Sequence, residues 1–380
     1  MATATTGIPE LDDALGGVLW GDNVVLEAED PAAHEPFYAA AAESADRYDS
    51  AVYVAVESEP DEVRSRFPAL DVLDARAQSP LARPGALVQA LRRAATPSTR
   101  DLVLFDPLET MTARWGAEIG ARFFTRACPL LLQLGAIAYW SVRPASLPQR
   151  LRREIESVTQ CVVVLADGRL RVAKAEGRRP GVEGGVFRYG VEDGRPVLAA
   201  APAAARLGTA LQAIRKARRL SQGDLARLAG VSASAISQAE RGRRGLSLET
   251  LVELSAKLGI TIDELLRGDL APGYRLGRRD RPPGREEGRP WPLLDDPRAG
   301  LRAYTARLAP GEAGAPRFPH KGVELVAVGS GLVQVELPTG RPVLRGGEAL
   351  LAEASGVTGW RNLGESEAVL FWVLRDEART

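Results

Sequence analysis

The stretch LSQGDLARLAGVSASAISQAERGRRG, residues 220–245, has the pattern of two short helices joined by a sharp turn. Ser221 precedes an acidic first turn, and Ser232 is a suitable N-cap for a second helix, because a serine oxygen can accept from free backbone N–H groups. Gly230 lies where the first helix must turn into the second. The apolar residues that recur at helical spacing are Leu225, Leu228, Ala229, Val231, Ile236 and Ala239.

The helical pattern extends over residues 206–267, with Ser247 as a further N-cap and Thr261 and Glu264 as a capping-box pair. This segment closely resembles the helix-turn-helix of the phage-repressor (XRE) family. The matching residues are Ser221-Gln222, Asp224-Leu225-Ala226, Ala229-Gly230-Val231-Ser232, Ile236-Ser237 and Glu240-Arg241-Gly242. The resemblance implies a five-helix DNA-binding domain over residues 206–268. Its second motif helix, about Ser232 to Ala239, would enter the major groove of double-stranded DNA.

The same resemblance assigns the DNA contacts. Base-reading side chains would be those on the outer side of the second helix, Ser232, Ala233, Ser234, Ser237 and Gln238. A glutamine can contact adenine in a bidentate manner, serine hydroxyls suit several bases, and alanine offers only a methyl group. Phosphate contacts would come from Gln222, Arg241 and Arg243. Because the base-reading side chains are short, we expect specificity to rely partly on a dimer and on DNA shape.

Local charge agrees with a polyanionic partner. Between Arg206 and Gly245, nine basic residues stand against only Asp224 and Glu240. Over the whole chain, 49 basic residues balance 49 acidic ones, so net charge indicates no partner. A helical module that binds protein and has an ordinary basic surface remains an alternative.

Length and composition are those of a folded soluble protein, with 380 residues, 45% hydrophobic and 26% charged, enough for two or three domains. The N-terminus lacks the pattern of a signal peptide, and the most apolar stretch, residues 129–142, is too short to span a bilayer. We therefore expect a cytoplasmic protein without membrane contact. Cys128 and Cys161 lie in apolar contexts typical of buried reduced thiols, and two histidines leave little for a metal site.

Residues 1–200 alternate apolar strands with helical patterns, which predicts crossover units and a largely parallel sheet. The expected strands are residues 23–28, 51–57, 101–106, 136–142 and 161–167, with a helix at 116–135. Residues 168–179 and 184–198 are expected as shorter antiparallel strands. The alanine-rich segment 198–205 has the composition of a linker.

This part resembles the KaiC branch of the RecA-like ATPases. The resemblance rests on TTGIPELDDALGG (residues 5–17), Gly21, and the strands NVVLEA, AVYVAVE and DLVLFD in order. It implies a RecA-like α/β domain whose nucleotide site follows the first strand. A working phosphate loop reads G-x-x-x-x-G-K-[ST], in which glycine amides and a lysine hold the phosphates.

At the corresponding positions this chain replaces every required residue. The two glycines, the lysine and the hydroxyl are replaced by Ala28, Ala33, His34 and Glu35. The acidic side chains in and around this loop would repel a triphosphate, at a cost on the order of several kcal/mol for a pair in contact. We expect a pseudo-ATPase that serves in assembly or binds an effector without phosphate. His34 is expected to be an exposed loop residue rather than a catalytic base.

Two acidic residues of the implied site remain. Asp106 stands at the Walker B position and Glu57 where the family has a catalytic acid. Without a working phosphate loop these acids have no bound nucleotide to act on, and we expect Asp106 to form hydrogen bonds at the end of its strand. The rival hypothesis is an enzyme, a KaiC-like nucleotide-dependent ATPase or switch tethered to DNA.

The C-terminal part, residues 298–380, has short alternating strands with Gly and Pro turns, typical of a small sandwich or barrel. Residues 269–297 are rich in Pro, Gly and Arg and are expected to form a linker. Residues 308–337 and 344–374 resemble a cupin β-barrel. The resemblance implies the fold class as a whole: an α/β RecA-like domain, an all-α helix-turn-helix domain and an all-β cupin barrel.

The metal-ligand slots of the cupin motifs are incomplete. They hold Phe318, His320 and Glu324, then Thr358 and Asn362, and neither Phe318 nor Thr358 is a usual ligand. We therefore expect no metal, no cofactor and no catalytic residue here. The possible effector pocket comprises Phe318, His320, Glu324, Thr358 and Trp360. Phe371 and Trp372 could join it, or could equally be ordinary core.

The combined prediction is a sequence-specific transcriptional regulator that binds double-stranded DNA as a homodimer or higher homo-oligomer. Two recognition helices would lie one DNA turn apart on a two-fold site. The flanking domains would serve in oligomerisation or in sensing a small-molecule effector.

Overall fold

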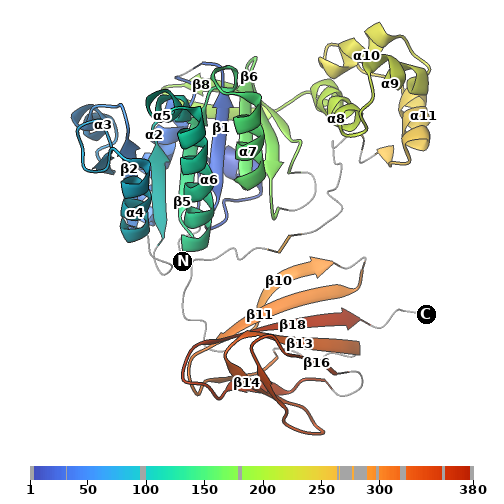
Figure 1. Cartoon of the computed structure of the whole chain (residues 1–380). Helices are drawn as coiled ribbons and strands as arrows, with labels where there is room; N and C mark the ends of the chain where they lie inside the picture. The colour runs from blue at the N-terminus through green and yellow to red at the C-terminus, as the bar shows by residue number, and fades with distance from the viewer. Residues whose placement is uncertain are drawn as a thin grey trace. The chain divides into compact units, whose positions relative to one another are not determined.

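The computed structural model describes residues 4–30, 32–94, 100–178, 182–262, 265, 276–277, 289–296, 299–316, 322–352 and 356–376. The chain divides into two compact units, residues 1–274 with 280–283, and residues 275–279 with 284–380. Figure 1 shows an α/β part and a helical part in the first unit and a β-rich part in the second.

A nine-stranded sheet forms the α/β part, in the order β3-β2-β4-β5-β1-β6-β7-β8-β9. The strands are β1 (Asn23–Ala28), β2 (Ser50–Ala55), β3 (Asp71–Asp74), β4 (Asp101–Phe105), β5 (Ile137–Val142), β6 (Cys161–Ala166), β7 (Arg169–Ala175), β8 (Val186–Glu192) and β9 (Arg195–Ala200). Pairing is parallel from β3 through β6 and antiparallel from β6 to β9. This confirms the predicted N-terminal parallel sheet. The edge strand β3 was not predicted, since four residues give almost no period.

Helices cover both faces of this sheet (Figure 1). They are α1 (Pro9–Leu15), α2 (Glu35–Glu43), α3 (Pro60–Arg66), α4 (Pro84–Ala94), α5 (Leu108–Trp115), α6 (Ala117–Leu134) and α7 (Gln149–Val158), with 3-10 turns at Ala45–Arg47 and Pro144–Ser146. Along β1, Val24 and Leu26 pack with α1 and α2, whereas Val25 packs with α6. Burial on both sides explains why the strands are continuous apolar runs. Within the described residues, no helix is long and apolar enough to cross a membrane.

The two cysteines are buried and free, as predicted. Cys128 lies in α6 and Cys161 begins β6. Burial raises the pKa of the Cys161 thiol to about 12 and that of Cys128 well above its usual value. Both thiols are therefore protonated near neutral pH.

The predicted linker at 198–205 is mostly wrong. Strand β9 runs to Ala200 and α8 (Ala203–Ala217) begins three residues later, which leaves Ala201 and Pro202 as the connection. Alanine is the strongest helix former, so the alanine run after Pro202 starts a helix instead of a flexible segment.

The helical part contains α8, α9 (Gln222–Ala229), α10 (Ala233–Glu240) and α11 (Leu248–Leu258) around one apolar core. The core residues Leu211, Leu225, Ile236 and Leu254 are fully buried. A fifth helix was predicted to start at Thr261. Its capping partner Glu264 lies outside the described residues.

The β-rich part consists of two antiparallel sheets around a shared core. One sheet has the order β10 (Trp291–Asp296), β11 (Leu301–Leu308), β18 (Ala368–Asp376), β13 (Gly322–Ser330), β16 (Ala349–Ala352). The other has the order β12 (Ala313–Gly314), β17 (Gly359–Asn362), β14 (Leu332–Glu336), β15 (Val343–Arg345). Strand β10 lies inside the segment predicted as a linker, residues 269–297. The Pro292 beside its irregular pairing masked the strand pattern.

Candidate nucleic-acid interface

Three serines cap the N-terminal ends of α9, α10 and α11. Ser221 Oγ accepts from the Asp224 N–H at 3.1 Å, and the Asp224 carboxylate accepts from the Ser221 N–H at 2.9 Å. Ser232 Oγ accepts from the Ala235 N–H at 3.1 Å, and Ser247 caps α11. Between α9 and α10, Gly230 adopts φ 66°, a left-handed conformation that suits glycine. The predicted starts and the predicted turn are confirmed.

A buried ion pair connects α10 to its neighbours α8 and α9. The side chain of Glu240, at the end of α10, is only 2% exposed and accepts from Arg215 of α8 at 2.6 and 3.1 Å. Gln222, at the start of α9, donates its amide to the same carboxylate at 2.8 Å. A Cβ on Gly208 would come within 2.2 Å of the Ala239 carbonyl oxygen, so α8 and α10 are in close backbone contact.

This network gives two residues partners that the sequence did not indicate. Gln222, which is predicted to contact phosphate, is half-buried, and its amide also donates to Glu240. Glu240 was counted against the basic residues of the segment, and its charge is neutralised by Arg215. Glu240 lies 18 residues from Gln222 and 25 residues from Arg215 in the chain, so local sequence pattern could not reveal these bonds.

The outer side of α10 carries the predicted base-reading residues. Ser232, Ala233, Ser234 and Gln238 are exposed, and Ser237 is half-buried. On the inner side, Ile236 and Ala239 are fully buried in the core. A helix can enter a DNA groove when its outer side is exposed and carries short polar side chains, and when packing of its inner side fixes its position.

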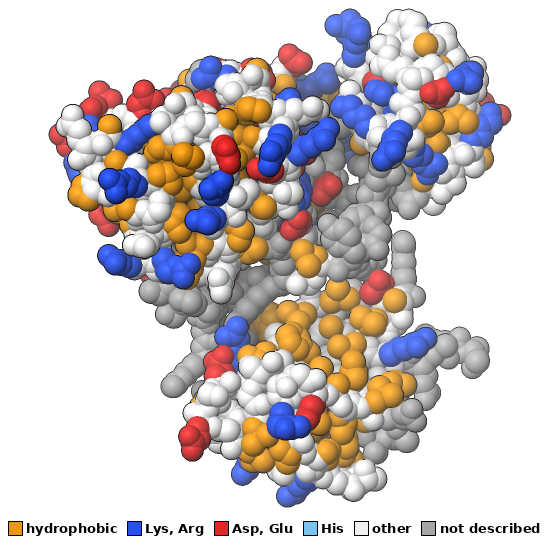
Figure 2. Space-filling view, viewed as in Figure 1, with side chains coloured by type: hydrophobic (Ala, Val, Ile, Leu, Met, Phe, Trp, Pro, Cys, Tyr) orange, Lys and Arg blue, Asp and Glu red, His pale blue; other side chains and the backbone are white. Residues whose placement is uncertain are grey.

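Both acidic residues of the segment are already paired, because Asp224 bonds Arg227 and Glu240 bonds Arg215. Seven cations of residues 206–245 are exposed and, within the described residues, form no ion pair; these are Arg206, Lys216, Arg218, Arg219, Arg241, Arg243 and Arg244. Figure 2 shows Lys and Arg side chains gathered on the helical part. The surplus of positive charge is thus available to phosphates.

The loop predicted to be a degenerate nucleotide site lies between the central strand β1 and the helix α2. Strand β1 ends at Ala28 and α2 begins at Glu35, which pairs with Arg66 at 3.0 Å. His34 was predicted to be an exposed loop residue; it does lie in the turn before α2, but its exposure is lower than predicted. It is half-buried at the N-terminus of α2, with its ring edge-on to Tyr38 at 4.8 Å. An aromatic residue one turn further along a helix gives the imidazole a packing partner. Ala33 is half-buried beside it.

Asp106 is 1% exposed, and its carboxylate fastens the loop after β2. It accepts from the N–H groups of Val56, Glu57 and Ser58 at 2.7, 2.7 and 3.0 Å. The hydroxyls of Tyr53 and Ser58 donate to it at 2.7 Å each. Burial and the neighbouring Asp106 charge raise the pKa of Tyr53, which keeps this phenol a neutral donor. Glu57 itself is exposed. All lone pairs of the Asp106 carboxylate therefore accept hydrogen bonds from the protein, as expected of a structural residue.

The residues of the predicted effector pocket occupy different environments. Glu324 is 1% exposed and accepts from the Val357 N–H at 3.1 Å and Trp372 Nε1 at 2.8 Å. Trp360 is core, with its ring 5.8 Å from that of Trp372. Thr358 is exposed and donates to the Glu336 carbonyl at 3.0 Å.

Two other aromatic predictions have different outcomes. Trp372 belongs to the core, which was one of its two predicted roles. Phe371 is 39% exposed on the outer side of β18, so it does not belong to the core. Phe318 and His320 lie outside the described residues. Within the described ranges, no group of three His, Cys, Asp or Glu side chains could hold a metal ion.

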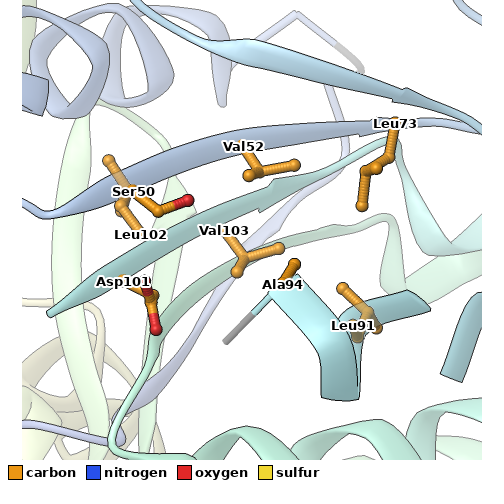
Figure 3. A pocket seen from close by; sticks show the side chains of 8 residues that line it. All are labelled: Ser50, Val52, Leu73, Leu91, Ala94, Asp101, Leu102 and Val103. Carbon is orange, nitrogen blue, oxygen red and sulfur yellow. The ribbon is translucent and has the colours of Figure 1, made fainter. Parts of the chain in front are cut away.

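Two hollows in the α/β part are poor ligand sites. The first, between β2, β4 and α4, measures about 10 Å³, room for at most one water (Figure 3). The second is an open groove of about 410 Å³ beyond the ends of β2 and β3. Its two guanidinium groups are already engaged. Arg114 donates to the Val56 and Ala75 carbonyls at 3.0 and 2.7 Å, and Arg76 pairs with Asp74.

The geometry defines a multidomain chain with a capped, basic helix-turn-helix unit between an α/β part and a β-rich part. Residues 211–265 match the helix-turn-helix family HTH_3. No curated protein matches the chain. The family match supports DNA binding by this segment.

Three solved structures illustrate what this chain is similar to. An HTH_3 family transcriptional regulator from Vibrio cholerae is 21% identical, over 46% of this chain and 97% of its own, with a TM-score of 0.22. A cupin domain of an XRE family transcriptional regulator from Enterobacter cloacae is 19% identical, over 23% and 95%, with a TM-score of 0.22. The restriction-modification controller protein C.AhdI from Aeromonas hydrophila is 37% identical, over 16% and 94%, with a TM-score of 0.16. TM-scores this low carry no functional argument.

Proposed function

We propose that this chain is a sequence-specific, double-stranded-DNA-binding transcriptional regulator that inserts α10 into the major groove. The observation that carries the proposal is the uncovered polar face of α10, followed within three residues by Arg241 and Arg243, which form no ion pair within the described residues. Within this face, Gln238 is the side chain long enough for bidentate base contact, and the arginines supply phosphate contacts. The match of residues 211–265 to the helix-turn-helix family supports the same reading.

The α/β part would be a RecA-like pseudo-ATPase that no longer hydrolyses nucleotide. Support comes from the acid-containing loop between β1 and α2, and from Asp106, whose oxygens are all engaged by the loop after β2. A carboxylate that accepts five hydrogen bonds has no lone pair left for a magnesium ion. The rival, a nucleotide-dependent switch, would require saturable magnesium-dependent ATP binding, which calorimetric titration detects.

The β-rich part would be a cupin that supports dimerisation or senses a small molecule, without a catalytic role. Its buried Glu324 is bonded to Trp372 and to a backbone amide, which fits a structural carboxylate better than a metal ligand. Dimerisation would present two copies of α10 to a two-fold DNA site.

The test of base reading begins with selection of bound fragments from a random duplex library. On the selected site, Gln238→Ala is expected to weaken binding by about 1–3 kcal/mol and to relax the preference at one base position. Arg241→Ala should instead weaken binding to all duplexes alike, because a phosphate contact carries no sequence information. Fluorescence anisotropy measures both.

The matched control is Gln212→Ala, which removes an exposed glutamine from α8 and should leave affinity and preference unchanged. Equal site preference in the wild type and in the Gln238→Ala variant would contradict the assignment of α10 as the base-reading helix.

A further inference from the structure

The five-stranded sheet of the β-rich part has an outer face that differs from the usual pattern. Along β13, Glu324 and Val326 point into the core, whereas Val323 and Leu325 point outward and are each 37% exposed. An antiparallel sheet with one face on a core normally presents polar residues to water on the other. Here the outward positions are apolar as well.

The pairing register places outward side chains in rows, because residues directly opposite in antiparallel strands lie on the same face. One row crosses all five strands and consists of Leu351, Leu325, Val373, Ala303 and Leu294. In the adjacent row Phe371 lies between Ala327 and Thr305, and the Thr305 hydroxyl donates to the Leu370 carbonyl at 3.0 Å. Leu351 is 57% exposed and Phe371 39%. We call these two rows the outer apolar face, and Figure 2 shows hydrophobic side chains gathered over this part of the chain.

Charge is confined to the margins of this face. Within the described strands, its outward charged residues are Arg307, Arg375 and Asp296, each near a strand end. Arg307 is paired with Glu367 at 3.1 Å. The centre, around Leu325, therefore presents no charge that a partner would have to neutralise.

The size of the face fits a protein partner. The whole outer side of the sheet, with five strands about 4.8 Å apart and about 3.3 Å per residue, measures on the order of 500 Å² per copy, of which the two rows of the outer apolar face make up about 300 Å². Two whole sheet sides, with the apolar rows at the centre and the charged margins as a rim, bury on the order of 1,000 Å², the size at which a specific interface becomes stable. Exposed apolar patches of this extent are uncommon in monomers and mark interaction sites.

We propose that the outer apolar face binds the same face of a second copy of this chain and forms a two-fold dimer. A two-fold interface sets a surface against itself, so residues near the axis meet their own copies. Such a surface must carry no charge at its centre, and homodimer interfaces are accordingly more apolar than other interfaces. Both conditions hold around Leu325. The inference rests on the proposed function in one respect, since a dimer is what a two-fold DNA site requires.

The experiment measures the mass of the full chain by light scattering at about 1–100 μM, concentrations that bracket a micromolar dimer. The wild type is expected to be a dimer. Leu325→Glu and Leu351→Glu each bury an uncompensated charge at the interface and should raise the dimer dissociation constant at least about 100-fold. The matched control is Val343→Glu, an exposed apolar position (44%) on β15 of the other sheet, which should remain dimeric.

Leu351 is more than half exposed on the edge strand β16, so its substitution should leave the fold intact, as the unchanged circular dichroism spectrum would show. A monomeric wild type over the whole range would overturn the proposal. Dimers that persist in both face variants would also overturn it and would place the contact elsewhere, for example in the α/β part.

Failure of the interface and failure of the proposed function give different results. A random-sequence duplex of about 12 base pairs has room for a single helix-turn-helix unit. The monomeric variants should bind it with wild-type affinity. If the wild type itself did not bind this duplex, the DNA-binding proposal would fail while the dimer measurement still decided the interface.

Discussion

Replacing Asp106 with alanine is expected to destabilise the α/β part by about 4 kcal/mol, the largest effect we predict. The substitution would leave three backbone N–H groups and the hydroxyls of Tyr53 and Ser58 without their acceptor in a buried place. Each orphaned buried donor costs about 1–3 kcal/mol, and water entering the site would recover part of the sum. The loss should appear as a lower urea midpoint of the α/β transition.

Two variants sharpen this test. Asp106→Asn keeps the volume but turns an NH₂ group toward the donors, so it should lose nearly as much stability. The control Asp71→Ala removes an exposed carboxylate from β3 and should leave the midpoint unchanged. A fully stable Asp106→Ala protein would contradict the structural role of Asp106 and revive its interpretation as a metal ligand.

The second large effect concerns the ion pair beneath the recognition helix. Glu240→Ala leaves the Arg215 guanidinium and the Gln222 amide without their shared acceptor, at a cost of about 3 kcal/mol. Hydrogen exchange of the amides of α8 to α10, measured in the full chain, should then be about 100-fold faster. DNA affinity should fall as well, because α10 would lose its tie to α8 and α9.

Replacing both partners separates the charge from the packing. Arg215→Met combined with Glu240→Leu should recover most of the lost protection, since apolar replacement of a buried pair is often neutral. Glu253→Ala, which breaks the exposed pair with Lys257 on α11, should leave exchange unchanged. Normal protection in the single Glu240→Ala variant would contradict the anchoring role of the pair.

The features that sequence predicted best are those that short segments determine. Ser221 caps a helix through Asp224, three residues away, and Gly230 ends that helix because it can adopt positive φ. The apolar runs of β1 and β5 predict strands because they are buried on both sides. The helix-turn-helix and the parallel sheet could therefore be predicted from local pattern.

Long-range partners explain what sequence could not predict. The acceptor of Gln222 is Glu240, and nothing in the local pattern shows that this acid is buried. The donors to Asp106 come from 48 to 53 residues earlier in the chain. The outer apolar face appears only when the register sets β10, β11, β18, β13 and β16 side by side.

The most direct test of the central claim maps where duplex DNA touches the chain. The full-length protein is bound to a selected duplex that contains iodouracil, irradiated and digested with trypsin. Cleavage after Arg227 and Arg241 releases Leu228–Arg241, a single peptide that contains all of α10. We predict that the cross-linked nucleotide is found mainly on this peptide. Cross-links confined to peptides of the α/β or β-rich parts, with none on residues 228–241, would contradict the account.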